Sequence, residues 1–282
     1  MQDIQKTIIG KLPNYSKNQR LLANYILENL QTIPLLSVND LAEKSGVSSA
    51  TVVRFSRVLG FQGYLEFRNY LMELLKEKLS LVDKYKATIS KKDEYQDSLN
   101  KVAHQVVQNI NHSLAQNTLE EFKHIVTHLH EADNIYCMGF GISKYLAEIM
   151  SYQLKLYLKK SFAMSADSLT FAEQIVLMSP KDLLIAFSFP PYSRQTVEAA
   201  QLAKRLKIPV VSFTDKKTAP IVEHSLHVLI AKTDNILFTN SLGAISVMIN
   251  ALVTEIALTE ENRVLEGLQK IDKHVNDPRY YY

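Results

Sequence analysis

The stretch VSSATVVRFSRVLGFQGY, residues 47–64, gathers side chains that can bind a polyanion. Small hydroxyl residues come first, and two arginines follow three residues apart. Hydroxyl groups permit close approach and hydrogen-bond phosphates, and an arginine can donate two hydrogen bonds to guanine O6 and N7. We therefore expect DNA contacts from this stretch, made by Ser48, Ser49, Thr51, Arg54, Arg57, Gln62 and Tyr64.

Two helices and a tight turn are needed to position these side chains. Residues 39–60 have that form, because Gly46 permits a sharp turn and Ser48 can cap the helix that follows. DNA-reading helices present their N-terminal residues to base edges in the major groove. An ordinary amphipathic helix is the alternative. In either case one side should pack on Leu41 and Ala42, and it comprises Val52, Val53, Phe55, Val58 and Leu59.

Composition places the chain among globular proteins and gives its N-terminal part a weak positive bias. Hydrophobic residues make up 46% and charged residues 22% of the 282 residues, enough for two domains. Residues 1–85 contain 11 Lys or Arg and 8 Asp or Glu, whereas the remainder contains 21 of each kind. The whole excess of positive charge therefore lies in the part that contains the predicted DNA-reading helix.

A reducing, cytoplasmic location is expected from cysteine usage and from the lack of a signal pattern. Cys137 is the only cysteine and lies in an apolar run, so it cannot form an internal disulfide. The most apolar stretch, residues 241–258, contains Asn250 and Glu255. It predicts a buried helix and not a membrane span.

The second half of the chain alternates short apolar runs with helical patterns. Five runs have strand length: residues 134–139, 161–166, 182–188, 209–215 and 226–231. Such alternation predicts a five-stranded parallel sheet with helices on both faces, a flavodoxin-like α/β domain behind an all-α head. We expect domain boundaries at 1–78 for the head, 79–116 for a helical connector and 117–282 for the α/β domain with its C-terminal helices.

A glycine-containing loop follows the first predicted strand. Gly139, Gly141 and Ser143 stand between that strand and the next helix, where glycines allow close ligand approach and a helix N-terminus attracts anions. A dinucleotide loop is an alternative, but the third glycine and the ribose-binding acid are missing. A tight turn with no ligand is the other reading.

Both halves of the chain resemble one family. Residues 16–75, above all LAEKSGVSSATVVRFSRVLGFQGYLEFR at 41–68, resemble the N-terminal helix-turn-helix domain of RpiR-family bacterial transcriptional regulators. Residues 120–260, with IYCMGFGISKYLAEIMSYQL and DLLIAFSFPPYSRQTVEAAQLAKRLKIPVVSFTD, resemble the SIS domain, the sugar isomerase fold. The resemblance implies a regulator that binds an operator in double-stranded DNA and senses a phosphorylated sugar.

The resemblance also implies a phosphate site made of two loops. The first, Gly-x-Gly-x-Ser, is intact, but in the second Pro190 and Pro191 replace a serine and a glycine of Ser-x-Ser-Gly-x-Thr. These prolines remove two backbone donors and one hydroxyl. A small anionic metabolite, such as a sugar phosphate, is still expected, and the predicted contacts are Gly139, Gly141, Ser143, Ser188, Ser193, Arg194 and Thr196.

Two other functions remain open at this stage. A sugar-phosphate isomerase would need a base at the ligand, for which Glu148 and Glu173 are candidates only by their position in sequence. A SIS domain without a ligand could serve as a dimerisation module. We expect a non-enzyme that forms a homodimer or homotetramer. No cofactor or metal is expected, because the histidines, including His124, His128 and His130, show no metal-ligand spacing.

Overall fold

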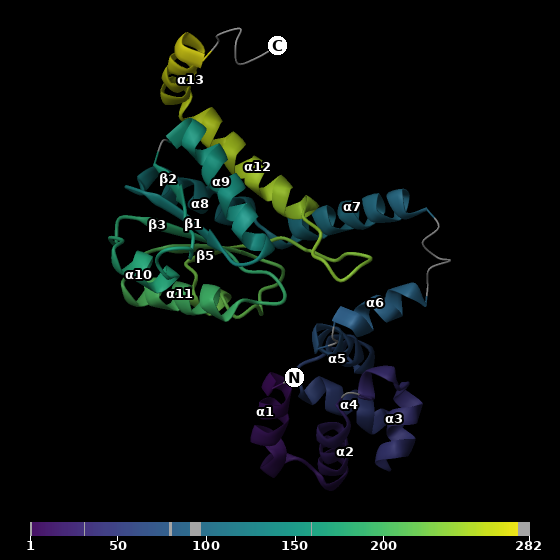
Figure 1. The fold of residues 1–282 in the computed structure, drawn as a ribbon. Coiled ribbons are helices and arrows are strands. Elements are labelled where there is room, and N and C mark those ends of the chain that lie inside the picture. The colour runs from purple at the N-terminus through teal and green to yellow at the C-terminus, as the bar shows by residue number, and fades with distance from the viewer. Residues whose placement is uncertain (1, 31, 79–80, 91–96, 159, 276–282) are drawn as a thin grey trace. The chain divides into compact units, whose positions relative to one another are not determined.

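The protein is divided into two compact units, Met1–Ser90 and Lys91–Tyr282, in a computed structural model that describes residues 2–30, 32–78, 81–90, 97–158 and 160–275. Each unit has a hydrophobic core of its own. Parts of the predicted connector, residues 79–80 and 91–96, lie outside the described residues. Figure 1 shows the elements of both units.

The described secondary structure of the first unit consists of helices joined by turns. Two short 3₁₀ turns, Leu12–Asn14 and Ile33–Leu35, interrupt the α-helices. The helices are α1 Gln2–Lys11, α2 Lys17–Asn29, α3 Val38–Ser45, α4 Ser49–Val58, α5 Tyr64–Lys78 and α6 Leu81–Ile89.

The boundaries of α3 and α4 follow from local chemistry. Ser37 and Asp40 form a reciprocal capping box at the start of α3, with bonds of 2.9 and 3.1 Å. Gly46 ends the helix at a φ of 70°, in the left-handed region that favours glycine, and its N–H donates to the carbonyls of Ala42 and Glu43. Ser48 then caps α4, as expected. The predicted helix, glycine turn and second helix are therefore present.

The core of this unit fixes the orientation of α4. Phe55 is 0% exposed, and its ring meets the ring of Tyr15 edge to face, with centroids 5.1 Å apart. Val52 and Leu59 lie in the same core as Leu41. The prediction for Val58 was wrong. Its side chain is 41% exposed, because the apolar positions of α4 cover more of the helix surface than the core can bury.

The second unit contains a parallel sheet and its covering helices. A 3₁₀ turn, Val222–His224, precedes the last strand. The strands are β1 Ile135–Gly139, β2 Ser161–Ala163, β3 Leu183–Phe187, β4 Val210–Thr214 and β5 His227–Ile230. The helices are α7 Ser98–Gln116, α8 Leu119–Glu131, α9 Ile142–Leu158, α10 Phe171–Val176, α11 Arg194–Arg205, α12 Gly243–Thr259 and α13 Glu261–Val275.

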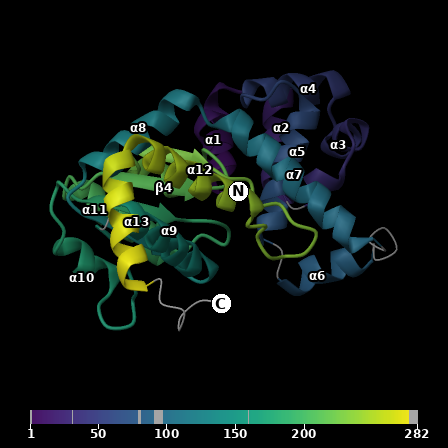
Figure 2. The same cartoon turned by 90° about the horizontal axis from the view of Figure 1, so that it is seen from above.

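All five strands run parallel in the order β2-β1-β3-β4-β5. One face of the sheet carries α8, α9 and α12, and the other carries α10 and α11 (Figures 1 and 2). This confirms the predicted fold. Successive strands are added toward one edge of the sheet from β1 to β2 and toward the other edge from β3 to β5. Ligands of open α/β sheets bind outside the carboxyl ends of the strands at such a switch point, here between β1 and β3.

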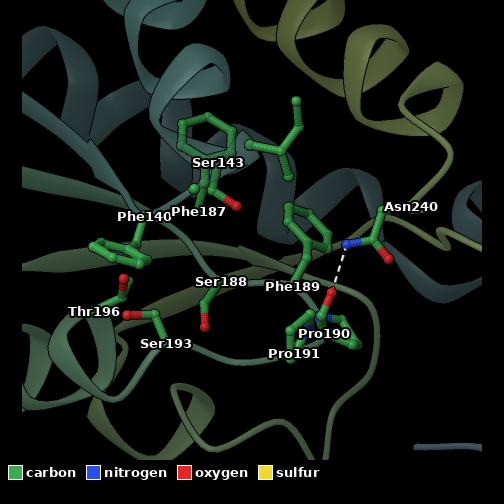
Figure 3. A pocket seen from close by; sticks show the side chains of 12 residues that line it. Phe140, Ser143, Phe187, Ser188, Phe189, Pro190, Pro191, Ser193, Thr196 and Asn240 are labelled. Carbon is green, nitrogen blue, oxygen red and sulfur yellow. Dashed lines mark hydrogen bonds between the residues drawn. The ribbon is translucent and has the colours of Figure 1, made fainter. Parts of the chain in front are cut away.

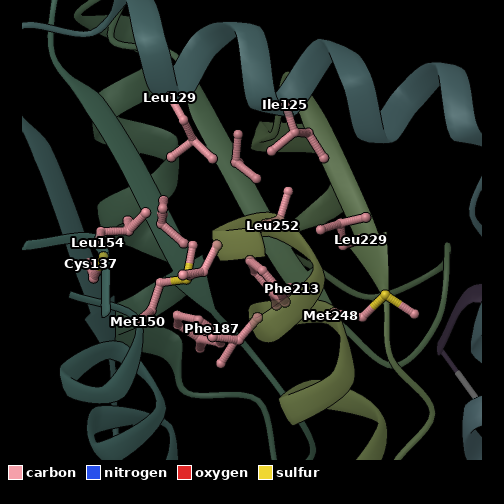
Figure 4. Packing of buried hydrophobic residues seen from close by; sticks show 14 of the residues in the cluster. Ile125, Leu129, Cys137, Met150, Leu154, Phe187, Phe213, Leu229, Met248 and Leu252 are labelled. Carbon is pink, nitrogen blue, oxygen red and sulfur yellow. The ribbon is translucent and has the colours of Figure 1, made fainter. Parts of the chain in front are cut away.

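Side chains of the central strands alternate between the two faces. Along β3, Leu183, Ile185 and Phe187 pack toward α9 and α12, while Leu184 and Ala186 pack toward α10 and α11. Figure 4 shows the larger of these two cores. Cys137 lies in the same core, and burial raises the pKa of its thiol to about 12. The cysteine is therefore structural in this fold.

Helix α7, which falls in the predicted connector, groups with the second unit in this structure. It packs on α12, and the side chain of Asn117 just after it completes the edge of β5. Asn117 Nδ2 donates to the carbonyl of Ile230 at 2.8 Å, and the N–H of Ile230 donates to Asn117 Oδ1 at 2.8 Å. The polar sequence before α7 favoured a connector, and no local pattern predicted these contacts.

Candidate DNA-reading helix and effector pocket

Helix α4 presents its hydroxyl residues in an ordered arrangement. The Oγ of Ser48 accepts from the N–H of Thr51 at 3.2 Å, and the two side-chain oxygens lie 2.9 Å apart. Ser49 Oγ donates to Asn39 Oδ1 at 2.9 Å, which ties the start of α4 to α3. Ser48 is exposed, and Ser49 and Thr51 are partly exposed. These hydroxyls are thus held in place and remain accessible.

The two arginines are exposed on α4 and are held by backbone carbonyls. Arg54 Nε donates to the carbonyl of Ala50 at 3.3 Å, one turn earlier. Arg57 Nε donates to the carbonyl of Gln62 at 3.1 Å, and the N–H of Gln62 donates in turn to the carboxylate of Glu66. Arg57 therefore fixes the turn after α4, and both guanidinium groups remain at the surface.

Tyr64 does not belong with the exposed residues, contrary to the prediction. It is buried in the core of the first unit. Its hydroxyl lies 3.0 Å from the carbonyl of Leu36 and 3.3 Å from that of Ile33, and it can donate to either. Burial raises its pKa to about 12. The sequence places it among polar residues, but it anchors the start of α5 to the turn before α3.

A pocket of about 250 Å³ opens in the second unit where the loops after β1 and β3 meet (Figure 3). This is the switch point of the sheet. None of its described lining residues is charged. They are Phe140, Gly141, Ile142, Ser143, Phe187, Ser188, Phe189, Pro190, Pro191, Ser193, Thr196 and Asn240.

In the first loop, the two glycines have different roles. A Cβ at Gly139 would stand 2.3 Å from the carbonyl oxygen of Ser143, so this glycine permits close packing of β1 on α9 and does not line the pocket. Gly141 lines the pocket and adopts a φ of 61°, in the left-handed region. Ser143, in the first turn of α9, lines it as well.

The segment from the end of β3 to the first turn of α11 contributes hydroxyl groups that lack hydrogen-bond partners among the described residues. Ser188 is 2% and Thr196 is 1% exposed, and neither Ser188 Oγ nor Thr196 Oγ1 has a hydrogen-bond partner among the described residues. Ser193 stands at the N-cap of α11 without making a side-chain cap. Buried polar groups in proteins are normally paired. Three hydroxyls near the N-terminus of α11 are thus available to a bound group.

The diproline segment forms an apolar wall opposite these hydroxyls. Phe189, Pro190 and Pro191 lie on that side of the pocket, and Asn240 adjoins them (Figure 3). Asn240 Nδ2 donates to the carbonyl of Pro190 at 2.6 Å. Sequence reasoning missed Asn240, because it comes from the loop between β5 and α12, far along the chain, and no motif surrounds it.

Arg194 and the two candidate bases lie elsewhere. The side chain of Arg194 is 90% exposed, pairs with Glu198 one turn later at 3.3 Å and is not among the described lining residues of the pocket, so its contact with the effector stays a prediction. Glu148 is exposed on α9, and Glu173 belongs to the capping box of α10, where it accepts from Thr170. The described lining of the pocket contains no carboxylate and no histidine.

No helix in the described parts of the chain is long and apolar enough to cross a bilayer. In the same residues, no three histidine, cysteine or acidic side chains are grouped to hold a metal ion.

Comparison with known proteins identifies both units. Residues 3–78 match the helix-turn-helix domain of the rpiR family, and residues 128–255 match the SIS domain. An uncharacterized HTH-type transcriptional regulator of Thermotoga maritima is 26% identical over 283 residues, covering 99% of this chain and 100% of that protein.

Solved structures agree with this assignment. The sugar isomerase domain of an RpiR transcription factor from Sphaerobacter thermophilus matches with a TM-score of 0.61 and 26% identity, over 63% of this chain and 99% of that chain. NanR of Vibrio vulnificus, solved with ManNAc-6P, shares the fold at a TM-score of 0.59 and 24% identity, over 97% of this chain and 100% of that chain. The chain therefore belongs to the RpiR family of transcriptional regulators, with a helix-turn-helix domain followed by a SIS domain.

Proposed function

We propose that this regulator binds double-stranded operator DNA through α4 and senses a phosphorylated sugar or a related anionic metabolite in the pocket beside β1 and β3. The observation that carries the sensing role is the pair of buried, unpartnered hydroxyls of Ser188 and Thr196. Both hydroxyls can donate to a ligand rich in acceptor oxygens.

DNA contact is assigned to the exposed front of α4. Ser48, Ser49 and Thr51 are placed to meet phosphates or base edges, and Arg54 to read a base. Arg57 and Gln62 at the following turn would contact the backbone. Tyr64 is excluded from this set because its hydroxyl is already used within the core.

A binding series with one operator tests this assignment. Genomic fragments that the protein retains would first define the operator, and Arg54→Ala should then weaken specific binding by about 1–3 kcal/mol at fixed salt. Arg20→Ala, which removes another exposed arginine, on α2, is the matched control. Equal operator affinity of Arg54→Ala and the parent would refute base reading by Arg54.

Effector binding is assigned to neutral donors. With no charged side chain in the described lining, the anionic group would be held by Ser143, Ser188, Ser193 and Thr196 together with the N-terminus of α11. The wall of Phe189, Pro190 and Pro191 would contact the less polar part of the ligand. The absence of a base from this lining favours a sensor over an isomerase.

Thermal unfolding with a panel of compounds tests the effector site. NanR suggests ManNAc-6P as one member, beside glucose 6-phosphate, glucosamine 6-phosphate and 6-phosphogluconate. A true effector at a hundred times its Kd stabilises the native state by about 2.7 kcal/mol. The shift should vanish in a Ser143→Ala, Ser193→Ala double variant. A shift that persists in this variant would place the compound elsewhere.

Tight operator binding also requires more than one copy of the chain. A single helix-turn-helix buries little surface, and such proteins read two half-sites about 10 base pairs apart or a multiple of that. We assign a homodimer or homotetramer that works beside its DNA in the cytoplasm. A monomeric mass at micromolar concentration, both free and on operator DNA, would contradict this assembly.

A further inference from the structure

Asn240 joins the pocket to the loop between β5 and α12. Its side chain lines the pocket, and its Nδ2 donates to the carbonyl of Pro190, which is itself part of the wall (Figure 3). A molecule in the pocket therefore adjoins both partners of this 2.6 Å bond. Asn240 thus links the diproline wall to the loop of residues 234–240.

The loop that carries Asn240 is closed on itself. The N–H of Ser241 donates to the carbonyl of Thr233 at 3.0 Å, and both residues are buried. The hydrogen bond thus brings together the two ends of the loop of residues 234–240. Asn240 and Asp234 are therefore adjacent to the two residues that this bond joins.

Helix α7 holds the other end of this loop. Asn109 Nδ2 donates to the carbonyl of Asp234 at 2.7 Å, and Ser113 Oγ accepts from the N–H of Lys232 at 2.8 Å. Asn109 is 2% exposed and its Oδ1 accepts from Gln105 at 3.2 Å, so both ends of its amide are used. A buried amide bonded in this way fixes one position of the loop on α7.

From these bonds we propose that Asn240 and Asn109 are positioning residues that couple the effector pocket to α7, a role that rests on the proposed sensing function. Only residues 90–97 separate α7 from α6 at the end of the first unit. An effector that binds one arrangement of the Pro190 wall more tightly shifts the loop, and with it α7. The chain leading to the DNA-binding unit starts from that helix.

Amide hydrogen exchange of the full chain tests the coupling without any effector. Asn240→Ala should raise exchange within residues 105–116 by about threefold or more, although Asn240 makes no bond to α7. Asn240→Asp removes the same donor with little change of shape and should act alike. Asn134→Ala is the matched control, because it also removes an asparagine donor, here to Asp182 Oδ1 at 2.9 Å, from a site that does not adjoin the loop of residues 234–240. Unchanged exchange in residues 105–116 in both Asn240 variants would overturn the proposal.

Operator affinity supplies the second measurement, with ManNAc-6P and glucose 6-phosphate as separate probes. In Asn109→Ala, and in Asn109→Leu, which keeps the branching at Cγ, a probe that changes the operator affinity of the parent should still raise the melting temperature as it does in the parent. The ratio of the operator affinities with and without that probe should fall to about 1 in both variants. A parent-like DNA response in both variants would refute the coupling. If neither probe affects the parent, sensing of these two compounds fails, and hydrogen exchange alone decides the coupling.

Discussion

The two units use the same kind of side chain in opposite ways. In the helical unit, the hydroxyls of Ser48, Ser49 and Thr51 are bonded to neighbouring groups and remain at least partly exposed. In the α/β unit, those of Ser188 and Thr196 are buried and have no described partner. The first arrangement is complete without DNA. The second leaves two hydroxyls to which a ligand can hydrogen-bond.

The two units also differ in the charge of their candidate binding surfaces. Arg54 and Arg57 are exposed on α4, where a long polyanion can attract them from a distance. The described lining of the pocket is neutral, so recognition there depends on directed hydrogen bonds and on fit. Exposed arginines suit a partner of fixed charge and variable sequence. A neutral pocket suits a small molecule that must be told apart from similar ones.

The largest expected effect tests whether the two units are energetically separate. Phe55→Ala should destabilise the helical unit by about 3–5 kcal/mol, because it empties a fully buried site against Tyr15. Calorimetry should show that the transition of the α/β unit stays at its parent temperature. A parallel loss in both transitions would mean that the cores are coupled.

Loss of a bonded hydroxyl should destabilise the helical unit. Ser48→Ala removes the N-cap of α4 and should cost about 1 kcal/mol, measured by urea unfolding. Ser48→Asp, which keeps an acceptor at the N-cap, is the control and should retain most of the stability. A parent-like midpoint for Ser48→Ala would show that the cap contributes nothing.

Loss of an unbonded hydroxyl should stabilise the protein, in contrast to the loss of the bonded hydroxyl of Ser48. Thr196→Val keeps the shape of the side chain and removes an unpartnered buried oxygen, so the α/β unit should gain up to about 1 kcal/mol in stability. The same variant should weaken the response to the effector in the thermal-shift panel. A loss of stability as large as that of Ser48→Ala would mean that Thr196 is already satisfied in the free protein.

The smallest effect concerns acid. Hydrogen bonds from the side chain and backbone of Ser37 hold the pKa of Asp40 below its ordinary value. A lowered pKa contributes stability above that ordinary value and loses it as the pH falls through the folded-state pKa. Between about pH 5 and about pH 3, Asp40→Asn should therefore lose slightly less stability in the helical unit than the parent does. Equal acid sensitivity by urea unfolding would contradict this.

The elements with local signals could be predicted from the sequence. Ser37, Gly46 and Ser48 mark the limits of α3 and α4 by capping and turn chemistry, and the apolar runs mark the five strands. The pocket location followed from strand order, since parallel strands bring the loops after β1 and β3 together.

Contacts between distant segments could not be predicted in this way. Asn240 reaches Pro190, and Asn109 reaches Asp234, across separations that no periodicity encodes. Side-chain direction was also beyond the sequence. Arg194 begins α11 beside the pocket but turns to Glu198, and Tyr64 turns inward to the carbonyl of Leu36.

The amide of Asn117 has a consequence for solubility and assembly. By occupying both the N–H and the carbonyl of Ile230, it blocks the open side of β5, where an intruding strand would otherwise pair. The opposite margin, β2, is only three residues long. The described borders of the sheet are therefore poor templates for β-aggregation, and pairing of two copies through their strand edges is disfavoured.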